Sequence, residues 1–490
     1  MPNVRRHSPL RAVLPVGLAA WLSACAAAPD LGPKPTLRAA SSIAAEQSLK
    51  AESVPAAWPA GDWWRGYGDP QLTALIEEGL RGSPDVAIAA ARLRAAQGAA
   101  QTAGAPLLPS IDARAQAGLE KQSKNLGIPP QFVPGGWQDV GQASLNLGFD
   151  IDLWGRNRAQ LAAATSDAEA ARIDRDLAGL MLTTGIAAAY ADLARLYAER
   201  DVRASAVELR LATQKLVSDR VRSGLDTRAE LKQADAAVPQ ARADLIAIDD
   251  AIITTRHQIA ALIGAGPDRG LAITRPALGA LHPLALPAQL TTDLVGRRPD
   301  IAAARARTEA AASRIKVARA DFYPAISLGA LIGVQSLGLA NLTDRQSIYG
   351  NAGPAVSLPI FHGGALSGRY RGARASYDEA VASYDKTVLT AYREVADAVT
   401  GRRAVADQIG ELRQALTDSE EAYAIARKRY EGGLSTYLDV LTAQERLLQV
   451  RLAAASVDAR AFAIDIALVR ALGGGFSATT ASNDKDSIHG

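Results

Sequence analysis

The only cysteine of the chain, Cys25, directly follows a Leu-Ser-Ala sequence. Upstream lie three arginines and a short apolar run over residues 12–20, which is the charge and hydropathy order of a bacterial export signal. Small residues before a cysteine are typical of a lipoprotein cleavage site, where the thiol is acylated. We therefore predict removal of 1–24 and lipid on Cys25. A plain secretory signal with an incidental cysteine is the open alternative.

Two carboxylates, Asp439 and Glu230, are the next candidates, because they lie 209 positions apart at matching places after glycine-containing turns. Asp439 follows Gly433 by six positions, within the first turns of a helical segment. A carboxylate at such a place is stabilised by the helix dipole, which is the structural interpretation of Asp439. The functional interpretation, a charged ring, requires several copies of the chain around one axis.

Other chemistry finds little support in the residue types. One cysteine and five histidines argue against a dedicated metal site, and neither an HExxH motif nor a glycine-rich phosphate loop is present. The sequence therefore predicts no catalytic residues, no metal and no cofactor. A net charge of +3, without a concentrated basic patch, also argues against a nucleic-acid partner.

The elements that would carry these residues are very long helices. Residues 364–431 contain no proline and repeat their apolar positions in sevens, which is typical of a coiled coil. Such a helix is roughly 100 Å long at 1.5 Å per residue. Glycines at 432 and 433 end it, and a second helical segment over 436–472 returns antiparallel to it. A long helical hairpin is therefore expected.

Matched spacings indicate an internal duplication. Pro84 precedes Pro109 by 25 positions, as Pro299 precedes Pro324, and the same agreement, over 40 positions, holds for Gly224 with Gly264 and for Gly433 with Gly473. Each half has short helices, a strand pair, a long helix and a return helix. The expected ranges in the first half are 70–104, 109–120 with 138–152, 155–222 and 226–264. Those in the second half are 288–321, 324–335 with 349–360, 364–431 and 436–472.

The four predicted strands alternate apolar and small or polar residues, as over 143–151, where the apolar face carries Leu145, Leu147, Phe149 and Ile151. This alternation occurs in membrane barrels and in half-buried soluble sheets. After residue 25 we expect no apolar run long enough for a membrane-spanning helix. Four strands cannot close a barrel in lipid, so membrane passage would require several chains to combine their strands. The residues alone leave the number of chains open.

A set of short motifs recurs in collinear order along essentially the whole mature chain. They occupy residues 22–25, 63–64, 69–72, 297–301, 322–324, 359–364, 393–398 and 430–441. Through these motifs the chain resembles the outer-membrane factor family, and within it the NodT-like lipoprotein channels of resistance-nodulation-division efflux pumps. One departure is Thr442, where the family commonly has an aspartate.

The resemblance implies a mainly α protein with β structure, built as a trimer. Twelve strands, four per chain, would form a transmembrane β-barrel, and the long helices a periplasmic α-helical barrel. The function implied is a passive outer-membrane channel that exports small molecules such as drugs, working with a periplasmic adaptor protein and an inner-membrane resistance-nodulation-division pump. A conduit for type I protein secretion is the alternative, although those channels usually lack the lipid signal. Ala26, where an aspartate would retain a lipoprotein at the inner membrane, favours the outer membrane.

Residue roles follow from the same resemblance. Asp439 would lie inside the closed periplasmic mouth, with Glu230 as a second acidic contributor. Arginines near the turns would hold the mouth shut, although a solvated helix-end charge is the commoner explanation for such arginines. The gate candidates are Asp439, Glu230, Arg429 and Tyr430. The candidates for the adaptor-contact turns are Gly224, Leu225, Gly433 and Leu434.

The expected organisation of the chain places all of these residues within two repeats. The predicted segments are a signal peptide over 1–24, a lipidated tether over 25–68, a first repeat over 69–266, a linker over 267–287, a second repeat over 288–475 and a disordered tail over 476–490.

Overall fold

The computed structural model describes residues 28–39, 42–49, 57–125, 127–277 and 290–477. The chain divides into two compact units, and each unit contains parts of both predicted repeats. Of the described residues, the first unit contains 28–37, 93–125, 127–170 and 304–384, and the second contains 38–39, 42–49, 57–92, 171–277, 290–303 and 385–477. The repeat boundaries and the other segment boundaries stay predictions.

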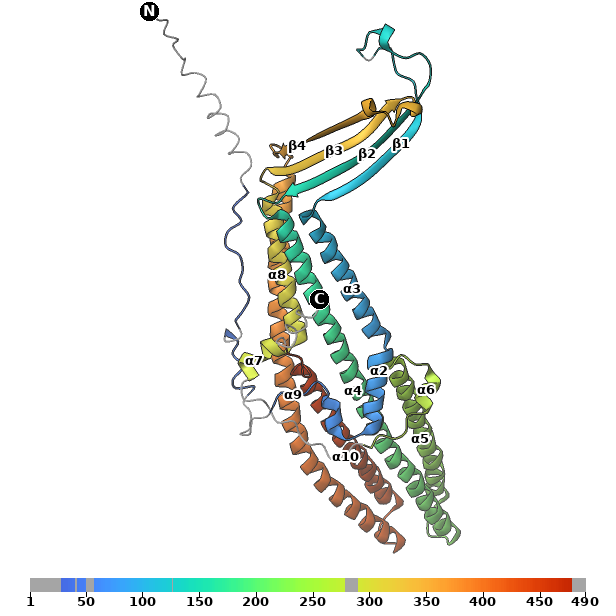
Figure 1. The fold of residues 1–490 in the computed structure, drawn as a ribbon. Helices are drawn as coiled ribbons and strands as arrows, with labels where there is room; N and C mark the ends of the chain where they lie inside the picture. The colour runs from blue at the N-terminus through green and yellow to red at the C-terminus, as the bar shows by residue number, and fades with distance from the viewer. Residues whose placement is uncertain (1–27, 40–41, 50–56, 126, 278–289, 478–490) are drawn as a thin grey trace, which may run out of the picture. The chain divides into compact units, whose positions relative to one another are not determined.

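The first unit contains a four-stranded antiparallel sheet in the order β1-β2-β3-β4, which Figure 1 shows as a single curved layer. Because sequence neighbours pair throughout, β1 and β4 are the two edges and neither is paired on its outer side within the chain. The strands are β1 (Ser110–Glu120), β2 (Gln138–Ile151), β3 (Ala325–Leu337) and β4 (Ile348–Ser357).

The register gathers the apolar residues on one face of this sheet. Ala113 lies opposite Leu145, which in turn lies opposite Ile332, and cross-strand partners share a face. The other face carries polar residues such as Asp112 opposite Asn146. Large apolar side chains on the first face are exposed, so the described residues leave it uncovered. They include Ile111, Leu119, Leu145, Leu147, Leu328, Ile332, Ile348 and Val356.

Nine α-helices are described, and the long helices and strands lie within three residues of their predicted bounds. The helical period and the glycine and proline positions therefore located these elements correctly. The helices are α2 (Pro70–Gly82), α3 (Pro84–Gly104), α4 (Arg156–Arg222), α5 (Arg228–Leu262), α6 (Pro267–Leu271), α7 (Leu290–Arg297), α8 (Pro299–Ala320), α9 (Ala365–Glu431) and α10 (Tyr437–Ala471). Short 3-10 turns occupy Trp63–Tyr67, Ala105–Leu107, Pro130–Phe132, Leu339–Asn341 and Arg345–Ser347.

The second unit has its main core where α2 and α5 pack against α4. Ile186 and Tyr190 of α4 are fully buried, as are Leu75 of α2 and Ile259 of α5, and α10 contributes Val469. By length and composition α4 could cross a membrane, so our expectation that no helix would qualify was wrong. Half of its most apolar window is buried, and α4 supplies core residues of the second unit such as Ile186 and Tyr190.

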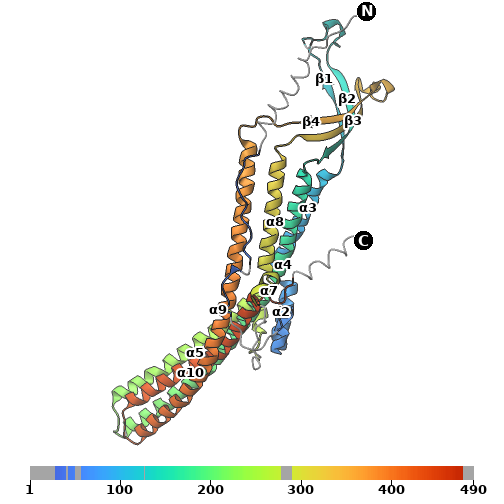
Figure 2. The ribbon, with the colours of Figure 1, turned by 90° about the vertical axis from the view of Figure 1, so that its left-hand side faces the viewer.

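Within the same unit the α4–α5 and α9–α10 hairpins lie side by side toward their turns, as both ribbon views show (Figures 1 and 2). A second cluster of buried residues joins them there. It includes Val217 of α4, Ala234 of α5, Tyr430 of α9, and Tyr437 and Leu447 of α10.

Candidate functional site: the turns of the two helical hairpins

Both hairpins reverse direction through the same backbone turn. Gly224 has φ +72° and Gly433 has φ +73°, in the left-handed region that favours glycine at the end of a helix. The amide of Leu225 donates to the carbonyl of Arg220 at 2.9 Å, and that of Leu434 to the carbonyl of Arg429 at 2.7 Å. The two leucines are 65% and 72% exposed, so each turn ends in an apolar side chain open to a partner.

The two predicted gate carboxylates cap the return helices. Asp439 Oδ2 accepts from the amide of Thr436 at 2.9 Å, and Thr436 Oγ1 accepts in return from the amide of Asp439 at 3.4 Å. Glu230 Oε2 accepts from the amide of Thr227 in the matching capping box of α5. These bonds satisfy amides that a helix start otherwise leaves unpaired. Within one chain, both residues therefore have the structural role.

The cap also changes the acidity of Asp439. Hydrogen bonds from the backbone and side chain of Thr436 lower the pKa of this carboxyl, and the nearby charge of Arg429 acts in the same direction. Asp439 is nevertheless exposed, so an ionised carboxylate remains open to solvent beside the turn.

A polar cluster that crosses between the hairpins lies just inside the turns. We call it the tip cluster: Arg220 of α4, Asp226 of the first turn, and Tyr430 of α9. Arg220 Nε lies 3.0 Å from Asp226 Oδ2, and the guanidinium lies 4.5 Å from the centre of the Tyr430 ring. The Tyr430 hydroxyl donates to the same Asp226 carboxylate, and Arg220 also reaches the carbonyl of Glu431 at 3.4 Å. This cluster ties the first hairpin to the second.

Burial strengthens the tip cluster. Tyr430 is only 1% exposed, and burial, followed by its hydrogen bond to Asp226, raises the pKa of its phenol. The hydrogen bond to Asp226 likewise raises the pKa of Arg220. The phenol therefore stays neutral and the guanidinium charged at neutral pH, which is the protonation state that the contacts require.

The structure thus brings together only part of the predicted site. Tyr430 belongs to the tip cluster, whereas the exposed Arg429 donates to the carbonyl of Leu434 at 3.4 Å instead. Asp226 was not among the residues predicted from the sequence. Its signal was an asymmetry between the repeats, because the matching position of the second turn holds Ser435. Cys25 lies outside the described residues.

Among the described residues, no group of three or more His, Cys, Asp or Glu side chains could hold a metal ion. Long helical hairpins, together with a four-stranded sheet that exposes one apolar face, define a mainly helical protein with one antiparallel sheet.

Comparisons with known proteins agree with this description. A family profile described as Outer membrane efflux protein matches residues 75–265 and 290–474. The chain is 36% identical over 370 residues to the fusaric acid resistance protein FusA of Burkholderia cepacia, covering 74% of this chain and 69% of that protein. It is 31% identical over 426 residues to the pyoverdine export outer membrane protein OpmQ of Pseudomonas putida, covering 86% and 90%.

A solved structure is also similar. The outer membrane protein VceC from Vibrio cholerae is 43% identical, with a TM-score of 0.80 and coverage of 86% of this chain and all of that one. The chain therefore belongs to the outer membrane efflux protein family, as its resemblance to outer-membrane factors predicted. It is an efflux channel protein of the outer membrane.

Proposed function

We propose that the chain is one of three identical subunits of a passive channel that crosses the outer membrane and serves a tripartite efflux system. The observation that carries this proposal is the sheet. One face is apolar and exposed, the other is polar, and both edges, β1 and β4, are unpaired within the chain. Lipid does not tolerate an open sheet edge, so β1 of one subunit would pair with β4 of the next.

Strand number favours three subunits. Two chains would supply eight strands, and the interior of an eight-stranded barrel is nearly filled by its own side chains. Three chains supply twelve strands, an even number with room for a lumen. The strands of 10 to 14 residues also have the length that a tilted strand needs to cross a bilayer. The long helices of three chains would then form the periplasmic part of the channel.

The mass of the detergent-extracted particle tests the assembly. We expect three copies of the mature chain and conductance in planar bilayers. A particle that contains one or two chains would contradict the trimer. A particle of three chains without conductance under any condition would instead contradict the channel.

The turns are the proposed contact with a periplasmic adaptor. Leu225 and Leu434 are exposed apolar side chains at neighbouring hairpin ends, and Gly224 and Gly433 hold the turns that expose them. An inner-membrane resistance-nodulation-division pump would supply the energy. FusA and OpmQ carry names that refer to resistance and to export of a small compound, which favours small-molecule efflux over type I protein secretion.

At rest, the mouth at these turns would be closed. Tyr430 would hold the two hairpins together through the tip cluster. The exposed carboxylate of Asp439, with Glu230 and Arg429 nearby, would line the opening in three copies and favour cations.

Lipid on Cys25 would provide a second membrane attachment. Fatty-acid labelling of the wild type and of Cys25→Ser tests it, with label expected on the wild type alone. Label retained by Cys25→Ser would contradict the lipoprotein prediction. We expect the variant to assemble still, because the barrel itself would hold the protein in the membrane.

A further inference from the structure

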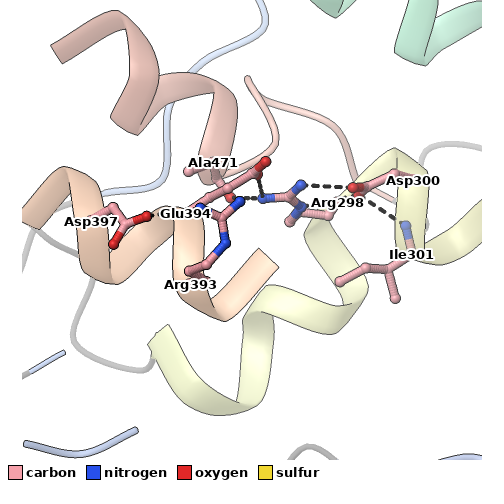
Figure 3. Close-up of polar contacts among 7 residues, drawn as sticks. All are labelled: Arg298, Asp300, Ile301, Arg393, Glu394, Asp397 and Ala471. Atoms are coloured by element: carbon pink, nitrogen blue, oxygen red, sulfur yellow. Dashed lines mark hydrogen bonds and ion pairs between the residues drawn. The ribbon is translucent and has the colours of Figure 1, made fainter. Parts of the chain in front are cut away.

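One buried arginine, Arg298, connects three helices at the end of the second hairpin that is remote from its turn. Its Nε and Nη2 bind the two carboxylate oxygens of Asp300 at 3.0 and 2.7 Å. Nη1 donates to Glu394 Oε2 at 2.8 Å and to the carbonyl of Ala471 at 3.0 Å. Figure 3 shows the guanidinium between these partners. We call Arg298, Asp300, Glu394 and the Ala471 carbonyl the root cluster.

The root cluster joins the start of α8 to the middle of α9 and to the last residue of α10. Arg298 is 5% exposed. Burial alone lowers the pKa of Arg298, but the hydrogen bond and charge of Asp300, followed by Glu394, outweigh it and raise the pKa above its usual value. The cation therefore persists, and its position at the carboxyl end of α10 matches the helix dipole.

The first repeat has the same backbone joint without this cluster. Gly264, after α5, approaches so closely that an added Cβ would lie 2.2 Å from the carbonyl oxygen of Gly82. Gly473, after α10, repeats the contact at 2.0 Å from the carbonyl oxygen of Arg297. Counting from these joints, Arg298 corresponds to Ser83 and Glu394 to Gly185, so the first repeat lacks both charges.

Because α9 is long, a small change in its angle at the root cluster becomes a large displacement of the turn. Glu394 and Tyr430 are 36 positions apart on α9, roughly 54 Å along the helix at 1.5 Å per residue. A change of about 5° in the direction of the hairpin at the root would therefore move its turn by about 5 Å. That displacement is larger than any hydrogen bond of the tip cluster can span.

We propose that Arg298 is a positioning residue for the channel mouth, because it fixes the direction of the α9–α10 hairpin and so holds Tyr430 against the first hairpin. The expected change in conductance rests on the proposed function, whereas the expected change in the direction of the α9–α10 hairpin does not. The first hairpin has Ser83 where the second has the buried Arg298, and it provides the fixed side. The direction of the second hairpin depends on the charge of Arg298.

The test uses the full chain as the assembled particle, in a Cys25→Ser background with a spin label on Lys428→Cys near the turn. Distances between the labels of the three copies, and basal conductance in planar bilayers, are measured for the parent and for Arg298→Gln. We expect longer and broader label distances and a several-fold rise in basal conductance. Arg298→Lys keeps the charge but loses the paired contact with Asp300. Its label distances and conductance should lie between those of the parent and those of Arg298→Gln.

The matched control is Arg393→Ala. Arg393 is the neighbour of Glu394 on α9 and pairs with Asp397, but both side chains of that pair are 65% exposed. The Arg393→Ala variant should have the label distances and conductance of the parent. If Arg298→Gln does not assemble, Glu394→Gln, which leaves the contact between Arg298 and Asp300 in place, takes its role with a smaller change expected in the same direction.

Assembled Arg298→Gln or Glu394→Gln particles with parent label distances would overturn the proposal. An effect of Arg393→Ala equal to that of Arg298→Gln would overturn it as well, because general disturbance of α9 would then suffice. Absence of conductance in the parent and in every assembled variant would count against the proposed function, while the label distances would still decide the role of Arg298.

Discussion

The two repeats share a backbone and differ in what holds it together. At the joints, Gly264 and Gly473 make the same close backbone approach. The first joint lies beside the apolar core with Ile186 and Ile263, whereas the second is bound by Arg298 and Glu394. Apolar packing is non-directional, whereas a buried guanidinium requires particular partners at particular angles. Both repeats therefore keep the close backbone joint, and only the second adds a buried charge cluster to it. We propose above that this cluster sets the direction of the α9–α10 hairpin.

The turns show the same divergence. The tip cluster takes Arg220 and Asp226 from the first repeat and Tyr430 from the second. The corresponding positions are Arg429, Ser435 and Val221, and they form no second cluster of this kind among the described contacts. This asymmetric polar cluster joins the two hairpins beside their turns, next to the buried apolar cluster that also holds them together. Farther from the turns, Arg210 of α4 bonds Gln444 of α10 at 2.7 Å.

The joint glycines should show the largest effect and should be equally important in both repeats. Gly264→Ala and Gly473→Ala place a Cβ against a carbonyl oxygen in a left-handed backbone, and we expect losses of about 3 kcal/mol or more in stability. Thermal unfolding and the yield of assembled particle measure this loss. Gly224→Ala and Gly433→Ala are the controls, because they have similar φ but open space around the new Cβ, and should cost about 1 kcal/mol. Equal losses at joint and turn would contradict the close-approach argument.

Variants at the two joints should differ in how strongly their loss of unfolding free energy depends on salt. Ile186→Ala in the first joint should cost about 2–5 kcal/mol through a buried cavity, nearly independent of salt. Glu394→Gln in the second should cost less, about 1–3 kcal/mol, because the Glu394 side chain is partly exposed and Arg298 keeps Asp300. Denaturant unfolding at low and high salt separates the two cases. If salt leaves the loss of unfolding free energy unchanged at both joints, the two repeats do not differ in this way.

The tip cluster should give a smaller change in stability and a clear change in conductance. Tyr430→Phe removes the donor to Asp226 but keeps the ring beneath Arg220, so we expect a loss of about 1 kcal/mol and a higher basal conductance. Tyr423→Phe, one heptad earlier in the same buried cluster, is the control. If both variants conduct alike, the hydroxyl of Tyr430 does not hold the mouth closed.

The capping carboxylate should give the smallest change in stability. Asp439→Ala should weaken cation preference in planar bilayers, because three ionised carboxylates would leave the mouth, and Glu230→Ala is the comparison. The lowered pKa of Asp439 means that its contribution to stability is complete above its ordinary value of about 3.8 and is lost as the pH falls through the still lower folded value. Selectivity should therefore be steady from pH 7 to pH 5. Unchanged conductance and selectivity in Asp439→Ala would leave the residue with its helix-capping role alone.

Sequence by itself determined the elements and their order. Heptads, period-two alternation and the spacing of Pro84, Pro299, Gly224 and Gly433 are local or periodic signals, and they located the long helices and the strands. It also indicated the family, because the motifs occur in collinear order along the chain. These features depend on neighbours a few residues away, which a single sequence displays directly.

Only the tertiary structure decided which charged residues meet. Arg298 and Glu394 are 96 positions apart, and Asp226 and Tyr430 are 204 apart, so no periodicity links them. Asp439, by contrast, finds its partner three residues away, and the helix start that it caps was visible in advance. Long-range partners are selected by how helices pack and by the high cost of leaving a buried charge unpaired, and packing exists only once the chain is folded.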